Sequence, residues 1–97
     1  MIYFARCGNT QWVKIGVATN VFTRLQQIQV YNPHRLRLMA VRYGGKKEES
    51  RLHKKFAAFN RHFEWFEISA ELRAFIEKQI PAIEYVKRLP KGQNWWL

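Results

Sequence analysis

The sequence predicts an α+β fold, in which a small, mainly antiparallel three-stranded sheet is flanked by helices. Two short apolar segments near the start are separated by a turn, which is the pattern of a β-hairpin. Three later segments carry apolar residues every three or four positions, as amphipathic helices do. The expected order is β-β-α-β-α-(β)-α, in which the bracketed strand has the weakest pattern.

The hairpin and a third strand make the sheet. Residues 2–6 are apolar and aromatic, as in a buried strand. Gly8 and Asn9 favour a turn, since both tolerate positive φ. Residues 12–17 alternate, so that Val13, Ile15 and Val17 face one side and Trp12, Lys14 and Gly16 face the other. Residues 36–43 alternate in the same way.

Three helices are expected between and after these strands. The first follows a cap at Thr19 or Asn20 and stops before Pro33. The second runs from about residue 47 to 59, and Ser69 caps the third, which Pro81 ends or kinks. Their apolar stripes are Val21, Leu25 and Ile28; Leu52, Phe56 and Phe59; and Leu72, Phe75, Ile76 and Ile80.

The remaining segments complete one domain. Residues 64–68 are too short for a helix and form a strand or an extended turn, and residues 82–88 add a helical turn. With 97 residues the chain has room for one domain, which we assign to residues 1–88. Residues 89–97 are a tail, and the aromatic side chains in it predict that the tail docks.

Composition excludes several classes of protein. The single cysteine, Cys7, rules out an internal disulfide and a cysteine zinc cage, which fits a cytoplasmic location. No apolar run approaches the ~20 residues that span a bilayer, so no membrane partner is expected. The first residues also lack the pattern of a signal peptide.

Charge points to nucleic acid as the partner. The chain has 17 Lys and Arg against 7 Asp and Glu, a net charge of +10. Such a field attracts polyanions through counterion release and steering, although solubility alone is the plainer explanation. We expect DNA in particular. The residues expected to contact it are Arg35, Arg37, Lys46, Lys47, Arg51, Lys54, Lys55 and Arg61.

Three polar side chains stand beside apolar stripes. Tyr3 lies mid-strand, Lys14 lies between apolar neighbours, and Arg24 borders the stripe of the first helix. Burying a cation costs free energy unless it meets an anion, such as a phosphate or a carboxylate. Structural explanations stay open: a core tyrosine, a lysine that extends to the sheet edge, and an arginine paired with Glu48 or Glu49.

The second helix supplies a carboxylate for this region. Glu49 and His53 are four residues apart and share one helix face, and Glu49 lies beside the buried stripe. One carboxylate suits Mg²⁺, which keeps most of its waters and takes other ligands from substrate phosphate. Glu48 is an adjacent rival, and His53 also fits a half-buried histidine with a structural hydrogen bond.

The order of these residues resembles the GIY-YIG nuclease superfamily over roughly residues 1–76. Ile2-Tyr3, a hairpin, and Lys14-Ile15-Gly16 look like its paired motif. Arg24 matches its helical arginine, and Glu49 matches its metal-binding glutamate. The stretch Glu49-x-x-Leu52-His53-x-x-Phe56, followed by Glu64-Trp65-Phe66, is similar to a phage and bacterial subgroup with KIG in place of YIG.

The resemblance implies a divalent-metal-dependent endonuclease. Glu49 would hold Mg²⁺ or Mn²⁺, and Arg24 would stabilise the charge of the transition state. Tyr3 would orient or deprotonate the attacking water, which requires a cation such as Lys14 to favour phenolate. Lys14 is alternatively a phosphate contact, and His53 positions a water or contacts the nucleic acid strand.

Departures from the superfamily pattern keep two other functions open. Met1 stands where the first motif has glycine, and Lys14 replaces the second tyrosine. Gln27 and Ile28 occupy the turn that usually carries a histidine or tyrosine, and Asn60 is a weak candidate for the C-terminal asparagine. The alternatives are an inactive module that binds nucleic acid, and an interaction protein for an acidic partner. An active enzyme this short would have low specificity or take it from a protein partner.

Overall fold

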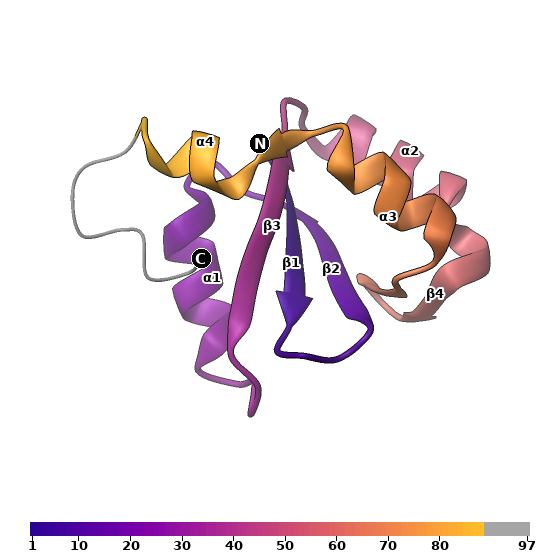
Figure 1. Ribbon diagram of the computed structural model, residues 1–97, viewed down its shortest axis with the longest axis horizontal. Helices are drawn as coiled ribbons and strands as arrows, with labels where there is room; N and C mark the ends of the chain where they lie inside the picture. Colours follow the sequence, from indigo (N-terminus) through magenta and orange to yellow (C-terminus); the bar gives the residue numbers. More distant parts are fainter. Residues whose placement is uncertain (89–97) are drawn as a thin grey trace.

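The hairpin expected at the N-terminus forms the centre of the sheet in the computed structural model, which describes residues 1–88 (Figure 1). Strand β1 (Ile2–Cys7) pairs antiparallel with β2 (Trp12–Val17) on one side and with β3 (Leu36–Arg42) on the other. Because β1 has a strand on each side, its side chains are among the most deeply buried of the described residues. The tail expected at residues 89–97 lies outside the described part.

The sheet is wider than the sequence predicted. It has six strands in the order β4-β5-β2-β1-β3-β6, every pair antiparallel, so the expected three-stranded sheet was wrong. The short strands are β4 (Asn60–His62), β5 (Trp65–Glu67) and β6 (Ile80–Pro81). Strand β5 lies within residues 64–68, where a strand or an extended turn was expected, whereas β4 and β6 were not predicted. Segments of two or three residues are too short to show an alternating pattern. Pairing with the longer strands defines them, and this is a tertiary effect.

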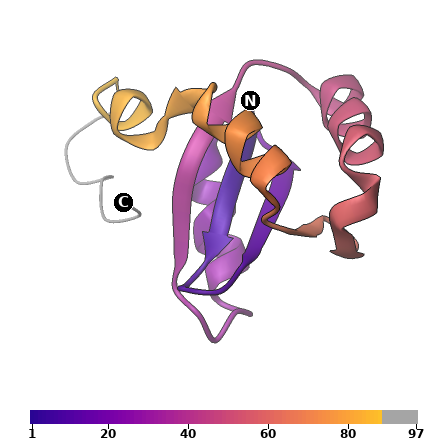
Figure 2. The ribbon, with the colours of Figure 1, turned by 45° about the vertical axis from the view of Figure 1, so that its right-hand side comes forward.

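Helices cover both faces of the sheet (Figures 1 and 2). The four helices are α1 (Val21–Gln29), α2 (Lys46–Lys55), α3 (Ala70–Glu77) and α4 (Ala82–Val86). The predicted caps of two helices are confirmed: the Asn20 side chain accepts from Thr23 N, and the Ser69 side chain accepts from Leu72 N. Among residues 1–88, no helix is long and apolar enough to cross a membrane.

The second helix ends earlier than predicted. Helix α2 stops at Lys55 instead of continuing to residue 59, and the short 3₁₀ helix η1 (Ala57–Phe59) follows it. Phe56 leaves helical geometry with φ −106° and ψ 21°. The chain bends here because it must enter β4 at Asn60, whereas the apolar spacing of the sequence continues through the bend.

Two hydrophobic layers hold the helices to the sheet. One lies under α2 and α3, where Leu52 and Phe56 meet Phe4 of β1 and Phe66 of β5. The other lies under α1 and α4, where the rings of Phe22 and Tyr85 stack at 5.7 Å. Lys14 and Gly16 of β2 lie on the α1 side, opposite Val13 and Ile15, as the alternation predicted.

Replacing Phe56 by alanine should strongly destabilise the domain. Phe56 has no exposed surface and contacts the rings of Phe59 and Phe75. We expect the free energy of unfolding to fall by ~3–5 kcal/mol, measured by urea denaturation. Phe63, which is 80% exposed, is the matched control, and its replacement by alanine should cost under ~1 kcal/mol. Equal losses in the two variants would contradict the described core.

Candidate active site

The candidate site lies at the edge of β2, just beyond the point where β5 stops. Within β2, strand β5 pairs with Trp12, Val13 and Lys14 alone, and a further backbone bond runs from Ile15 N to the carbonyl oxygen of Glu64. Helix α2 covers the next part of the edge. His53 Nε2 lies 2.8 Å from the carbonyl oxygen of Ile15, and since a carbonyl only accepts, the imidazole donates. This bond ties α2 to the sheet.

Tyr3 lies across β1 and β2 at this edge and is only 1% exposed. It pairs with Gly16, and a Cβ built on Gly16 would lie 2.4 Å from the Tyr3 hydroxyl oxygen. Only glycine therefore leaves room for the phenol. This close approach explains why a glycine follows Lys14-Ile15 in the second motif.

The Tyr3 hydroxyl is a neutral phenol at neutral pH. Burial and the charge of Glu64 raise the pKa of Tyr3 to about 12, and hydrogen bonding to Arg24 with its positive charge only partly offsets this rise. The sequence suggested that Lys14 would favour the phenolate. Instead, Lys14 forms an ion pair with Glu64. The Tyr3 hydroxyl therefore keeps its proton and can act as a hydrogen-bond donor.

Lys14 and Glu64 form an ion pair inside the sheet. Lys14 is 8% exposed, its Nζ lies 2.6 Å from Glu64 Oε2, and it lies 5.6 Å from the centre of the Trp65 ring. Glu64 was not among the predicted site residues. The signal that could have found it was the position of Lys14, because a lysine between buried apolar residues requires an anion.

Glu49 faces this pair with an unsatisfied oxygen. Its Oε2 is buried and has no hydrogen-bond partner within residues 1–88. Burial, followed by the charge of Glu64 and a hydrogen bond between the two carboxyl groups, raises the pKa of Glu49, so the unsatisfied atom is Oε2 and not the whole carboxyl group. Burial acts in the same direction on Glu64, but the hydrogen bond and charge of Lys14 lower the pKa of Glu64 below its ordinary value. Lys14 thus forms an ion pair with Glu64, whereas its charge and that of His53 only partly offset the rise in the pKa of Glu49.

The neighbouring Glu48 points to other partners. Its two oxygens accept hydrogen bonds from the Nε atoms of Arg51 and Arg42, both at 2.6 Å. These two bonds lower the pKa of Glu48 to about 2. Glu48 is thus saturated by arginines. Arg24 does not use it as a partner, and contacts Gln27 and the Tyr3 hydroxyl instead.

Comparison with known protein families gives a match over most of the chain. The model of the T5orf172 domain matches residues 1–85, which include every residue of this site. The chain belongs to the T5orf172 domain family. This domain occurs in phage and bacterial nuclease-like proteins, which agrees in part with the resemblance seen in the sequence. Neither a curated protein nor a solved structure matches the chain significantly.

The donor set of this T5orf172 domain suits a hydrated magnesium ion. Glu49 offers an oxygen without a partner, and Glu64 lies next to it. Within residues 1–88, no group of three or more His, Cys, Asp and Glu side chains could enclose a metal. Zinc normally takes three or four such protein ligands, whereas Mg²⁺ is held by one or two carboxylates and several waters.

The eight basic residues expected to contact DNA are all exposed, but they do not form one surface. Four of them line a hollow of about 410 Å³ on α2: Lys46, Lys47, Arg51 and Lys54. Lys47 lies two residues before Glu49 and Arg51 lies two residues after it, so both project from the side of α2 opposite to Glu49. Arg61 pairs with Glu67 at 2.6 Å, and Lys55 lies over the Phe75 ring. Arg35 and Arg37 lie at the start of β3.

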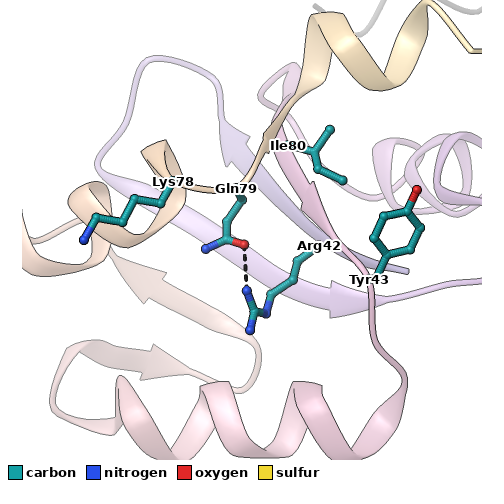
Figure 3. A pocket seen from close by; sticks show the side chains of 5 residues that line it. All are labelled: Arg42, Tyr43, Lys78, Gln79 and Ile80. Atoms are coloured by element: carbon teal, nitrogen blue, oxygen red, sulfur yellow. Dashed lines mark hydrogen bonds between the residues drawn. The ribbon is translucent and has the colours of Figure 1, made fainter.

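Another hollow lies at the far end of β3 (Figure 3). It measures about 400 Å³ and is lined by Arg42, Tyr43, Lys78, Gln79 and Ile80. Arg42 Nη1 donates to Gln79 Oε1 at 2.9 Å. No carboxylate lines this hollow, and the two carboxyl groups of the candidate site, Glu49 and Glu64, are not part of it.

Neutral substitutions of the two adjacent glutamates should change stability in opposite directions. In EDTA at pH 7, Glu49→Gln should raise the free energy of unfolding, because it removes a charge that burial and Glu64 oppose. Glu48→Gln should lower it, because it removes the acceptor of two arginines. Urea denaturation measures both.

The pH dependence follows the same signs. The raised pKa of Glu49 gives stability that is present below its ordinary value of 4.5 and lost as pH rises. The pKa of Glu48, lowered from 4.5 to about 2, gives stability that is present above 4.5 and lost as pH falls toward 2. If both variants lost stability at pH 7, the described environment of Glu49 would be wrong.

Proposed function

We propose that this T5orf172 domain is a metal-dependent endonuclease that hydrolyses phosphodiester bonds in nucleic acid, with DNA as the expected substrate. The observation that carries the proposal is the buried Glu49 Oε2, which has no partner within residues 1–88 and adjoins a second carboxylate. An unsatisfied buried carboxylate oxygen costs free energy, and in native proteins such an atom is accounted for by an ordered water, an ion or a catalytic role. Membership of a family found in nuclease-like proteins supports this function.

The acidic residues would hold the metal. Glu49 would be the direct ligand of Mg²⁺ or Mn²⁺, and Glu64 would hold a water of the ion while it neutralises Lys14. When bound, the ion polarises the scissile phosphate and stabilises the leaving oxygen. Glu48 takes no part, since Arg42 and Arg51 already occupy both of its oxygens.

The remaining residues would position and stabilise the reacting phosphate. Arg24 is exposed, and its guanidinium has the geometry to bind phosphate oxygens through two parallel hydrogen bonds. Tyr3, as a neutral phenol, would orient the attacking water instead of taking its proton. Lys14 would add positive charge from its place beside Glu64. His53 would act on position only, by fixing α2 to Ile15.

An inactive nucleic-acid-binding module is the second candidate. Two observations favour it: the pKa of Tyr3 is raised to about 12, and Lys14 forms an ion pair with Glu64. Both side chains therefore already carry their proton and cannot serve as the general base. In that case the net charge of +10 would bind DNA or RNA without turnover, and affinity would fall with salt.

Cleavage of supercoiled plasmid tests the enzyme directly. With Mg²⁺ or Mn²⁺, the wild type and Glu48→Gln should nick the plasmid at similar rates. Glu49→Gln should be slower by ~100-fold or more, because loss of the ion removes several kcal/mol of transition-state stabilisation. EDTA should abolish cleavage. The two variants change the net charge equally, so a general electrostatic effect would change both rates in the same way.

Metal binding can be measured without catalysis. Either ion should raise the Tm of the wild type and of Glu48→Gln, because a ligand that binds only the folded state stabilises it. The Tm of Glu49→Gln should not change. If no protein cuts DNA and no metal shifts the Tm, while all three bind DNA in a salt-dependent manner, the domain is a binding module. Weak DNA binding with a stoichiometric acidic protein partner would indicate an interaction protein.

A further inference from the structure

A groove with aromatic walls leads away from the candidate site on the α1 side of the sheet. It consists of two adjoining hollows of about 340 and 330 Å³, which share Trp65 and Asn32. The first is bounded by α1 and the turn after it, from Arg24 to Tyr31. The second is bounded by Trp12 of β2 and by Arg61 of β4, among others. We call the two together the aromatic groove.

The aromatic groove begins at the candidate site. Arg24 lines it and also hydrogen-bonds to Tyr3. Trp65 lines both hollows, pairs with Lys14 across the strands, and has its ring 5.6 Å from Lys14 Nζ. Trp12, two residues from Lys14, lies on the same face of β2. From Gly16 to Trp12 the strand covers ~13 Å, several times the ~3.4 Å between stacked bases, so a nucleotide fits beside the site.

The chemistry of this groove suits a nucleobase. Tyr31 is 89% exposed and Trp12 is 39% exposed, so two large rings stand open to solvent where a planar ligand can stack. Arg24 and Arg61 supply positive charge, and no Asp or Glu lines either hollow. Glu67, the ion-pair partner of Arg61, is not part of the lining. Aromatic rings beside cations are the usual means of binding single-stranded nucleic acid.

Asn32, where the two hollows meet, provides a polar contact. Its Oδ1 accepts from His34 N at 2.9 Å and from Cys7 Sγ at 3.6 Å. Its amide nitrogen donates no hydrogen bond to any group in residues 1–88. That nitrogen is therefore available to a carbonyl or ring nitrogen on the edge of a base.

We propose that the aromatic groove binds an unpaired nucleobase next to the scissile phosphate, so that the substrate is a strand with single-stranded or flipped-out nucleotides. The proposal rests on the proposed function for its substrate class, nucleic acid. A base in a duplex hides both faces in the stack, whereas stacking on Trp12, Trp65 or Tyr31 requires an exposed face. The phosphate of the same nucleotide would then lie toward Arg24 and Lys14.

Binding measurements in EDTA test the groove without cleavage. The probes are a short oligothymidine, an abasic deoxyribose-phosphate chain of the same length, and a duplex of the same length. The wild type should bind oligothymidine more tightly than either other probe. Tyr31→Ala and Trp12→Ala should each weaken oligothymidine binding by roughly 5- to 150-fold, equivalent to ~1–3 kcal/mol of stacking, and leave binding of the abasic chain unchanged.

Tyr43→Ala is the matched control. Tyr43 is 66% exposed and lies in the hollow at the end of β3, away from the groove (Figure 3). None of the three substitutions changes charge, so the salt dependence of binding should stay the same. Because Tyr31 is almost fully exposed, loss of binding in its variant cannot result from unfolding. Trp95 and Trp96, outside the described residues, are present in every variant.

The outcomes separate this proposal from the nuclease. Equal affinity of the wild type for oligothymidine and the abasic chain, preference for the duplex, or full affinity in both groove variants would overturn the groove proposal. Cleavage that depends on Glu49 would leave the nuclease standing in each of those cases. Base-dependent binding that Tyr31→Ala and Trp12→Ala lose would support the groove even if no metal-dependent cleavage were found.

Discussion

The ion pair between Lys14 and Glu64 is the constraint on which the rest of the site depends. It joins the middle of β2 to the start of β5 and allows a lysine to lie inside a sheet between apolar neighbours. The hydrogen bond and charge of Lys14 lower the pKa of Glu64, so Glu64 stays negatively charged. That charge raises the pKa of the neighbouring Glu49. Glu49 is left with a raised pKa and with a buried oxygen that has no partner among residues 1–88. A single pair thus sets up both the fold at this edge and the chemistry expected there.

The open edge of β2 lets residues from opposite faces of the sheet meet. Tyr3 and Arg24 belong to the α1 side, whereas Glu49 and His53 come from α2 on the other side. Gly16 has no side chain, which leaves room for the phenol of Tyr3 at this edge. If β5 were longer, it would occupy this edge. The shortness of β5 therefore keeps this part of the β2 edge free for the residues of the candidate site.

Positive charge and aromatic surface are distributed differently over the molecule. The lysines and arginines of α2 lie mainly on the side of that helix away from Glu49, where they can attract a nucleic acid but not place its phosphate. The aromatic groove is contiguous with the site and carries only a few cations. The basic side of α2 would then attract the nucleic acid over a distance, and the aromatic groove would position the reacting nucleotide.

The sequence determined the central elements and the order of the residues with chemical potential, because long alternating or helical patterns and caps such as Asn20 and Ser69 are local signals. It also placed Tyr3, Lys14, Arg24 and Glu49 close together through a resemblance. Only the tertiary structure decided strands β4 and β6, the early end of α2 and the partner of Lys14. It also decided that Glu48 pairs with arginines, whereas Glu49 keeps a buried oxygen without a partner among residues 1–88. Asn60, a weak candidate for a site residue, donates its side-chain amide to the carbonyl of Phe63 in the turn after β4. These outcomes depend on pairing between residues up to fifty positions apart, which no local pattern records.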